Sequence, residues 1–391
     1  MDTINAGKNT LVRSWASELD TGALEQAKRT ARSPALAGPV ALMPDAHFGL
    51  GATVGSVIPT ESAIIPAAVG VDIGCGMVAV ETSLQASHLP DNLDAVLSGI
   101  EQTVPAGFAK HKYARTRAET WLRKNPLETE VSLSTKQQRS IALQLGTLGG
   151  GNHFVEVCLD ERDTVWVVLH SGSRGVGNVL ARAHIADAKQ LCKQLDRSLE
   201  EKDLAYFLQT DPGFQAYIND MLWAQAYALE NREQMLDAVL AMLHQLLPLP
   251  FREKARINCH HNYTERETHD GRSLWITRKG AIRADDGDRG VIPGSMGTDT
   301  YIVTGLGNPD SYHSASHGAG RRLGRRQAER TLSVDDFTKA MKGRTWQSAD
   351  ARRLLDEAPM AYKNIDQVMA DQADLVRVDH QLSAIVNYKG F

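Results

Sequence analysis

The sequence predicts an α+β fold in one continuous domain of mixed β-sheets, with a helical insertion around residues 179–247. Short apolar runs such as Val165–Leu169, separated by glycine and proline, are typical of strands in sheets. Within the insertion, by contrast, apolar residues recur at helical spacing. No linker rich in proline, glycine and serine divides the chain, and it contains no internal repeat. These observations together favour one domain over several.

The composition is that of an ordinary soluble globular protein. Of 391 residues, 42% are hydrophobic and 23% are charged, which is enough for a large core. The formal net charge of −4 gives no overall attraction to nucleic acid, so a polyanion would need a local basic patch. Met1–Asp20 is polar and no apolar run reaches membrane-spanning length, so we expect a cytoplasmic protein without membrane contact. The four cysteines are too few for a disulfide framework, which favours free thiols.

The stretch from Met43 to Met77 is predicted to form short strands and tight turns, because glycine, proline and β-branched residues dominate it. Asp45 and His47 fall in its first turn cluster, where hydrogen bonding within the turn is the plain interpretation. Asp72 and Cys75 stand three residues apart between glycines. A carboxylate and a thiolate this close suit a divalent cation, and the alternative is a structural cysteine buried beside a turn.

Residues 81–140 look like scaffold. Helix formers gather in Leu93–Gln102 and Ala114–Lys124, with charges of both signs. Between and within these segments lies a basic group made of Lys110, His111, Lys112, Arg115 and Arg117. Such a group is typical of a solvated surface, and an RNA-facing patch is the alternative.

A glycine-rich loop and two strands come next. Leu145–Asn152 contains three consecutive glycines just before His153, and the amides of such a loop can face an anion. No Lys-Ser/Thr pair follows, so it is not a Walker A loop. A strand is expected from Phe154 to Val157, and the buried strand Val165–Leu169 ends at His170. A polar cluster at the end of a buried strand is where α/β-type folds commonly place their chemistry.

The aromatic and methionine residues of the helical insertion are interpreted as core, and Pro248 ends the helical pattern. Beyond it, the remaining expected elements are a hairpin that turns at Asp270-Gly271 and returns through Ser273–Thr277, strands within Val291–Val303, and helices around Val334–Met341 and Ala349–Glu357.

Six side chains from separate segments are candidates for one site: Asp72, Cys75, His153, His170, His261 and His317. One carboxylate, one thiolate and several imidazoles exceed what one tetrahedral ion needs and would serve two adjacent cations. Two cations stabilise both the entering and the leaving oxygen when phosphorus is attacked. Phosphoryl or nucleotidyl transfer is therefore the first class of reaction to consider, and a set of unrelated structural histidines is the alternative.

Seven motifs occur in order between Asp72 and Arg321: DIGCGM, GTLGGGNHFVEV, LHSGSRGVG, HNY, RKGAIRA, IPGSMGTDTYIV and SHGAGR. Together they resemble the RtcB family of RNA-splicing and RNA-repair ligases, over nearly the whole chain. The resemblance implies a single RtcB-like domain spanning residues 1–391. It also implies that RNA ending in a 2′,3′-cyclic phosphate or 3′-phosphate is joined to RNA with a 5′-hydroxyl, using GTP and two Mn²⁺ ions. The need for an accessory activator stays open.

The resemblance also implies roles for single residues. The manganese ligands would be Asp72, Cys75, His153, His170 and His261. His317 would be the nucleophile that takes GMP from GTP, before the GMP passes to the RNA 3′-phosphate and is expelled by the 5′-hydroxyl. The guanylate pocket would be lined by Asn152, His153, Phe154, Val155, Glu156, His261, Asn262, Pro293, Gly294, Ser295, Met296, Thr300, His317, Gly318, Ala319, Gly320, Tyr362 and Lys389. Arg174 and Arg321 would hold RNA phosphates.

Thr300 and Leu50 depart from the residues common in the family, and neither is a presumed ligand. Two other functions stay open: a metal-dependent phosphoesterase, because paired cations also activate water, and a non-catalytic RNA-binding relative. The setting of His317 among small residues favours the ligase, because a hydrolase needs no nucleophilic histidine beside a space for a purine.

Overall fold

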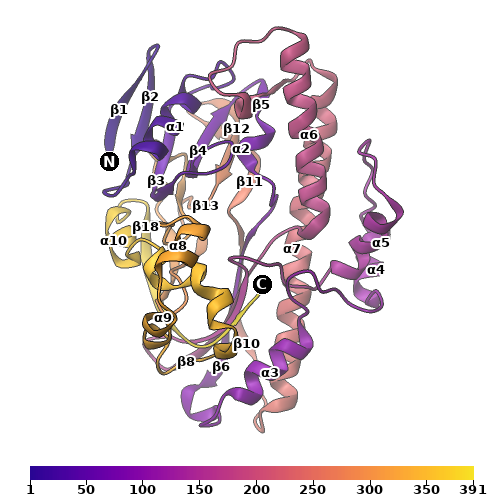
Figure 1. The fold of residues 1–391 in the computed structure, drawn as a ribbon, viewed down its shortest axis with the longest axis vertical. Coiled ribbons are helices and arrows are strands. Elements are labelled where there is room, and N and C mark those ends of the chain that lie inside the picture. The colour runs from indigo at the N-terminus through magenta and orange to yellow at the C-terminus, as the bar shows by residue number, and fades with distance from the viewer.

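Two large β-sheets lie beside a pair of long helices in the computed structural model, which describes residues 1–391 (Figure 1). The first sheet has six strands, and every neighbouring pair is antiparallel except β2 and β3. In spatial order its strands are β1 (Asp2–Gly7), β2 (Thr10–Ser14), β3 (Val40–His47), β4 (Val54–Thr60), β12 (Arg272–Lys279) and β11 (Asn262–His269). β11 and β12 form the hairpin predicted at Asp270-Gly271, which is confirmed.

The second sheet has eight strands. In spatial order they are β10 (Glu253–His260), β6 (Gly76–Gln85), β8 (Thr164–Ser171), β7 (Phe154–Leu159), β18 (Val376–Lys389), β15 (Thr300–Gly305) and β14 (Arg289–Pro293), with β17 (Thr345–Trp346) paired to β18. β8 is buried along its whole length because both faces of the sheet are covered. Val167 faces a cluster shared with the helices, whereas its neighbours Trp166 and Val168 face a cluster on the opposite side.

The chain crosses from one sheet to the other at His261. β10 ends at His260 in the eight-stranded sheet, and β11 begins at Asn262 in the six-stranded sheet. The backbone N–H of His261 donates to the carbonyl of Cys75 at 2.8 Å. The turn that carries Cys75 therefore lies where the two sheets adjoin.

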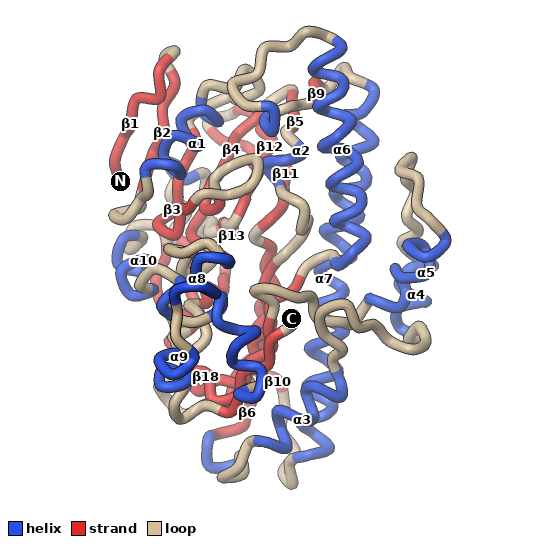
Figure 2. The backbone as a smooth tube through the Cα atoms, in the orientation of Figure 1, coloured by secondary structure: helices blue, strands red, loops and turns tan.

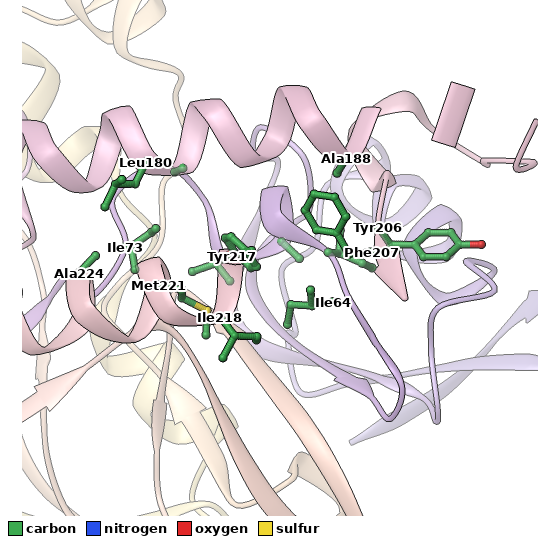
Figure 3. Close-up of a cluster of buried hydrophobic side chains, with 14 of the residues drawn as sticks. Ile64, Ile73, Leu180, Ala188, Tyr206, Phe207, Tyr217, Ile218, Met221 and Ala224 are labelled. Carbon is green, nitrogen blue, oxygen red and sulfur yellow. The ribbon is translucent and has the colours of Figure 1, made fainter. Parts of the chain in front are cut away.

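Helices α6 (Arg174–Gln194) and α7 (Pro212–Leu246) run along one side of the sheets (Figures 1 and 2). Pro212 occupies the first turn of α7, where its missing N–H has no partner to lose. Leu180 of α6 and Met221 of α7 pack in a buried cluster with Ile73 (Figure 3). Because Ile73 stands between Asp72 and Cys75, the helix pair supports this turn from behind.

The other elements are short. The helices are α1 (Thr21–Ala31), α2 (Pro66–Val69), α3 (Asp94–Thr103), α4 (Thr116–Lys124), α5 (Thr135–Gln144), α8 (Arg325–Thr331), α9 (Val334–Ala340) and α10 (Ile365–Asp371). Five 3-10 helices are η1 (Ala86–His88), η2 (Lys202–Leu204), η3 (Pro309–Ser311), η4 (Ser348–Glu357) and η5 (Pro359–Ala361). Two small ladders pair β5 (Ala63–Ile64) with β9 (Phe207–Leu208) and β13 (Ala281–Arg283) with β16 (Ser314–Ser316). None of the helices combines the length and the apolar character needed to cross a membrane.

The predicted α+β class with mixed sheets is confirmed, and three details differ. α6 begins at Arg174, whereas the helical pattern was predicted from about residue 179. Gly175 and Gly177 lie at the start of the helix, and glycines there resemble a loop in the sequence. Residues 195–211 interrupt the predicted helical insertion with a 3-10 turn and the short strand β9. In the C-terminal segment, where the predicted elements were helices around Val334–Met341 and Ala349–Glu357, Val376–Lys389 forms the 14-residue strand β18, which was not predicted.

Candidate active site

The five predicted metal ligands form one cluster around the Cys75 thiol. Nε2 of His153 and Nε2 of His170 each lie 3.3 Å from Cys75 Sγ. His261 Nε2 is 2.8 Å from His170 Nε2, and the Asp72 carboxylate is 3.1 Å from His153 Nε2. One ligand atom from each of Cys75, His153 and His170 lies within 4.8 Å of the others. The cluster joins side chains that are as far apart in the chain as residues 72 and 261.

Strand pairing explains why three of these ligands meet. β8 lies between β6 and β7, and His170 at its end is paired with Met77 on one side and Phe154 on the other. Cys75 precedes Met77 by two residues, and His153 directly precedes Phe154. The ends of three neighbouring strands therefore place the thiol and two imidazoles together.

Two glycines leave the space that the ligands fill. A Cβ added at Gly172 would lie 2.2 Å from Asp72 Oδ1, and one added at Gly149 would lie 1.9 Å from His153 Nδ1. Any side chain at either position would displace a ligand. The glycine-rich loops recognised in the sequence thus leave room for the Asp72 and His153 side chains.

Burial sets the protonation of the cluster. It raises the pKa of the Cys75 thiol well above its usual value, and the nearby Asp72 carboxylate raises it further. Burial also lowers the pKa of His170 and His261 well below the usual value, so both imidazoles are neutral. His170 Nδ1 lies 3.0 Å from the carbonyl oxygen of Asn152, which only accepts, so its proton is on Nδ1. The lone pair on His170 Nε2 therefore faces Cys75, as it does in a metal-binding histidine.

The donor set fits a divalent cation. A sulfur, three imidazole nitrogens and a carboxylate are borderline ligands that bind transition-metal ions. Although burial acts to raise it, the hydrogen bond from His153 holds the pKa of Asp72 below its usual value, so this ligand is ionised. Before a cation is bound, the Cys75 thiol must lose its proton and Nε2 of His153 must give up the hydrogen that it donates to Asp72, and the cation itself favours both changes.

His317 lies next to this cluster, one residue after β16. Its ring centroid is 4.7 Å from that of His261. Its Nδ1 lies 2.5 Å from Asp45 Oδ2, and its backbone N–H donates to the same oxygen at 3.2 Å. Because Nδ1–H donates to the carboxylate, Nε2 is the ring nitrogen left to act as a nucleophile.

The interpretation of Asp45 as a residue that hydrogen-bonds within a turn is wrong. Asp45 lies in β3, is fully buried, and orients His317 from 272 positions away in the chain. Gly320 secures this contact, because its φ is +74° and a Cβ there would lie 2.2 Å from the carbonyl oxygen of Asp45. An acid in a Gly/Pro-rich stretch gives no sequence signal for such a partner.

A cavity of about 600 Å³ opens beside the cluster, within the size range of small-molecule sites. Asp72, Cys75, His170 and His261 line one part of it. The other predicted site residues that line it are Asn152, Phe154, Glu156, Asn262, Pro293, Gly294, Ser295, Met296, Thr300, His317, Gly318, Ala319, Gly320, Arg321, Tyr362 and Lys389. Residues from eight separate segments thus surround one space.

Val155, which was expected to line the guanylate pocket, does not line this cavity. Side chains alternate along β7, so Phe154 and Glu156 face the cavity while Val155 packs on the opposite face of the sheet with the helices. His153 lies behind Cys75 in the cluster rather than on the cavity wall.

The two arginines expected at RNA phosphates are both hydrogen-bonded within the protein. Arg174 donates to the carbonyl of Gly107 at 2.8 Å and to Thr147 Oγ1 at 3.0 Å, outside the cavity lining. Arg321 lines the cavity and donates to Tyr362 Oη at 2.9 Å. Contact of either with RNA stays a prediction.

A buried ion cluster closes one part of the cavity around Glu357, which the sequence reasoning missed. Its carboxylate lies 2.8 Å from Lys389 Nζ and 2.7 Å from Arg325 Nη1, and it accepts from Tyr362 Oη at 2.8 Å. Although burial acts to raise it, Lys389 and Arg325 hold the pKa of Glu357 at about 2. Nearby, burial raises the pKa of Glu156 to about 7 despite the charge of Lys389. This part of the cavity thus holds an ionised carboxylate, Glu357, and one that titrates near neutrality, Glu156.

Comparison with known proteins identifies the family. Residues 26–390 match the family model described as tRNA-splicing ligase RtcB. The chain is 42% identical to RNA-splicing ligase RtcB of Escherichia coli K12, over 98% of both chains. It is 29% identical to RNA-splicing ligase RtcB of Mycobacterium tuberculosis, over 89% of this chain and 96% of the relative. With tRNA-splicing ligase RtcB of Nanoarchaeum equitans the identity is 28%, over 96% of this chain and 92% of that protein. The chain therefore belongs to the RtcB family.

Proposed function

We propose that this protein is a cytoplasmic, GTP-dependent RNA ligase whose residues 1–391 act as a single RtcB domain. It joins RNA that ends in a 2′,3′-cyclic phosphate or 3′-phosphate to RNA that begins with a 5′-hydroxyl. Membership of the RtcB family supports RNA ligation. The observation that carries the proposed chemistry is His317, oriented by Asp45 and adjacent to a five-ligand cluster inside a cavity of nucleotide size.

Asp72, Cys75, His153, His170 and His261 would hold two Mn²⁺ ions. When bound, the ions would neutralise charge on the phosphate groups and on the departing pyrophosphate. The close approach of the Cys75 thiol to two imidazoles supports this ligand set, because thiolate and imidazole are ligands that transition-metal cations take in proteins.

His317 is the nucleophile in this proposal. Its Nε2 lone pair attacks the α-phosphorus of GTP, the bond to the β-phosphate oxygen breaks, and pyrophosphate leaves. Asp45 accepts a hydrogen bond from Nδ1–H throughout, and its negative charge stabilises the positive charge that develops on the ring. An oxygen of the RNA 3′-phosphate then attacks the same phosphorus and releases His317. The 5′-hydroxyl of the second RNA finally attacks the activated RNA phosphate and expels GMP.

The guanine would lie at the part of the cavity that Glu156, Tyr362 and Lys389 line. Lys389 supports this placement because its ammonium group sits between Glu357, at 2.8 Å, and the ring of Phe154, at 5.2 Å from the centroid. A base in this space meets a cation, a carboxyl group and an aromatic ring, which can together select a purine.

Incubation with α-labelled GTP and Mn²⁺ tests the proposal. The wild-type protein is expected to retain label through denaturation, and His317→Ala is expected to retain none. His244→Ala, on the exposed surface of α7, is the matched control and should label like the wild type. Absence of label in the wild type, together with phosphate release from 3′-phosphorylated RNA, would identify a phosphoesterase instead.

A further inference from the structure

A second hollow lies in the segment between α3 and the glycine-rich loop before His153, away from the cavity described above. It measures about 530 Å³ and lies between residues 110–112 and helix α5. Its lining includes Lys110, His111, Lys112, Lys136 and Arg139, and a single hydrophobic residue. α4 and α5, which carry part of this segment, lie on the side of α6 and α7 that faces away from the sheets (Figure 2).

The charge of this segment is opposite to that of the protein. Residues 105–143 carry eight lysines and arginines against three glutamates, in a chain whose net charge is −4. Arg117 in α4 is neutralised by Glu230 and Asp237. Lys110, Lys112, Lys136 and Arg139 take part in none of the ion pairs of the structure, so the hollow presents four uncompensated charges. A concentration of like charge without partners favours an anion as the occupant.

Two exposed aromatic side chains flank these cations. Phe108 is fully exposed and Tyr113 is 73% exposed. Lys112 Nζ lies 5.4 Å from the centroid of the Tyr113 ring. A solvated basic face needs no exposed aromatic rings, whereas proteins that bind single-stranded nucleic acid combine cations for the phosphates with rings on which bases stack.

The hollow is linked to the active site through backbone contacts. His111 Nε2 lies 3.0 Å from the carbonyl oxygen of Gly146, and the Gly107 N–H donates to the Gly149 carbonyl. Gly149 is the residue that packs against the metal ligand His153. The segment that holds the cations is therefore attached to the loop that ends at the cluster.

We propose that the hollow between residues 110–112 and α5, with Phe108 and Tyr113, binds a single-stranded part of the RNA substrate without reading its sequence. This proposal rests on the proposed function, which makes RNA the substrate. Lys110, Lys112, Lys136 and Arg139 contact phosphates, and the two rings stack on bases. RNA held here is retained close to the loop that carries His153.

Binding of a fluorescein-labelled single-stranded RNA, measured by anisotropy over a series of KCl concentrations without GTP or Mn²⁺, tests the proposal. The slope of log Kobs against log [KCl] is negative, and Lys136→Gln/Arg139→Gln is expected to reduce its magnitude by about 1.4. Each phosphate contact of a single strand contributes about 0.7 to this magnitude. Arg123→Gln/Lys124→Gln, on exposed positions of α4 outside the hollow, removes the same charge and should keep the wild-type slope.

A second variant tests stacking separately from charge. Phe108→Ala/Tyr113→Ala is expected to weaken RNA binding about tenfold or more with an unchanged salt slope, because stacking releases no counterions. Wild-type affinity and slope in both the glutamine and the alanine variants would overturn the inference and leave the hollow to solvent or to another polyanion, such as an acidic protein.

Guanylylation by GTP needs no RNA, so it separates this inference from the proposed function. Normal labelling of the glutamine variant with weakened RNA binding supports both. Normal labelling with unchanged RNA binding overturns the inference alone, and no labelling of the wild type overturns the proposed function.

Discussion

Asp45 and His317 form the contact on which the proposed nucleophile depends. The carboxylate accepts both the ring Nδ1–H and the backbone N–H of His317, so one buried acid fixes the position, the tautomer and the rotation of the ring. A neutral imidazole presented in this way needs no base to become a nucleophile. The Asp45 charge matters most when the ring becomes positive during the attack on GTP.

Asp45→Asn is predicted to slow guanylylation of His317 by at least about 100-fold, because an amide can orient the ring but cannot stabilise the developing charge. GTP binding in equilibrium dialysis should stay close to that of the wild type, since Asp45 is buried behind the histidine. Wild-type guanylylation rates would show that the Asp45 contact has no part in the reaction.

Glu357 is the residue whose charge most affects stability near the cavity. Its pKa of about 2 lies below the usual 4.5, so folding favours the ionised form. This stabilisation is fully present above about pH 4.5 and is lost as the pH falls towards 2.

Glu357→Gln is predicted to lower the free energy of unfolding at pH 7 by about 3 kcal/mol, because Lys389 is left buried without its partner. The difference from the wild type should shrink when urea unfolding is repeated at pH 4 and pH 3. A difference that is the same at every pH would assign the loss to packing instead.

β18 is the longest strand of the structure, and it was not predicted from the sequence. It pairs with β7 on one side and β15 on the other, and it ends at Lys389 beside Glu357. Register shifts occur at Ala384/Val386 and opposite Ile302/Val303. Each shift changes the face that the following residues occupy, so the alternation expected of a strand is broken.

Burial along β18 predicts a sharp contrast between two valines. Val386→Ala is expected to cost about 2 kcal/mol, because its side chain is fully buried between the sheet and the helices. Val378→Ala, on the same strand but 45% exposed, should change the free energy of unfolding by less than about 0.5 kcal/mol. Equal losses in urea unfolding would contradict the placement of β18 in the sheet.

Elements with a strong local pattern were predictable, and those defined by distant partners were not. The apolar run of β8 and the Asp270-Gly271 hairpin follow from neighbouring residues, and both are present. The start of α6 was predicted too late because glycines at its first turn resemble a loop. The roles of Asp45 and Glu357 were not predicted, because they arise from partners 272 and 32 positions away in the chain.

At the scale of the whole molecule, the site lies where the chain passes between its two sheets. Residue types suggested Asp72, Cys75, His153, His170 and His261 as candidates for one site, and the motif resemblance implied their roles, but the sequence does not show how these distant segments come together. The crossing at His261 and the adjacent ends of β6, β8 and β7 supply that placement. Because the ligands come from distant segments, a bound cation ties the two sheets to each other.

Mn²⁺ is therefore predicted to stabilise the whole fold. At a concentration 100 times the dissociation constant, it should add about 2.7 kcal/mol to the free energy of unfolding and raise Tm in a thermal scan. EDTA should reverse the shift. Cys75→Ala should show almost none of it, whereas Cys192→Ala, at a buried cysteine in the helix core, should keep it in full. The same shift in both variants would contradict the ligand assignment.

The most direct test of the account is to locate the GMP adduct by peptide mass spectrometry after incubation with GTP and Mn²⁺. Seven histidine and lysine side chains line the cavity and offer a nitrogen for such a bond: His47, His170, Lys189, His261, Lys279, His317 and Lys389. The account predicts a single GMP on His317, lost when RNA with a 3′-phosphate is added. GMP on any other histidine or on a lysine, or a His317 adduct that persists in the presence of this RNA, would contradict it.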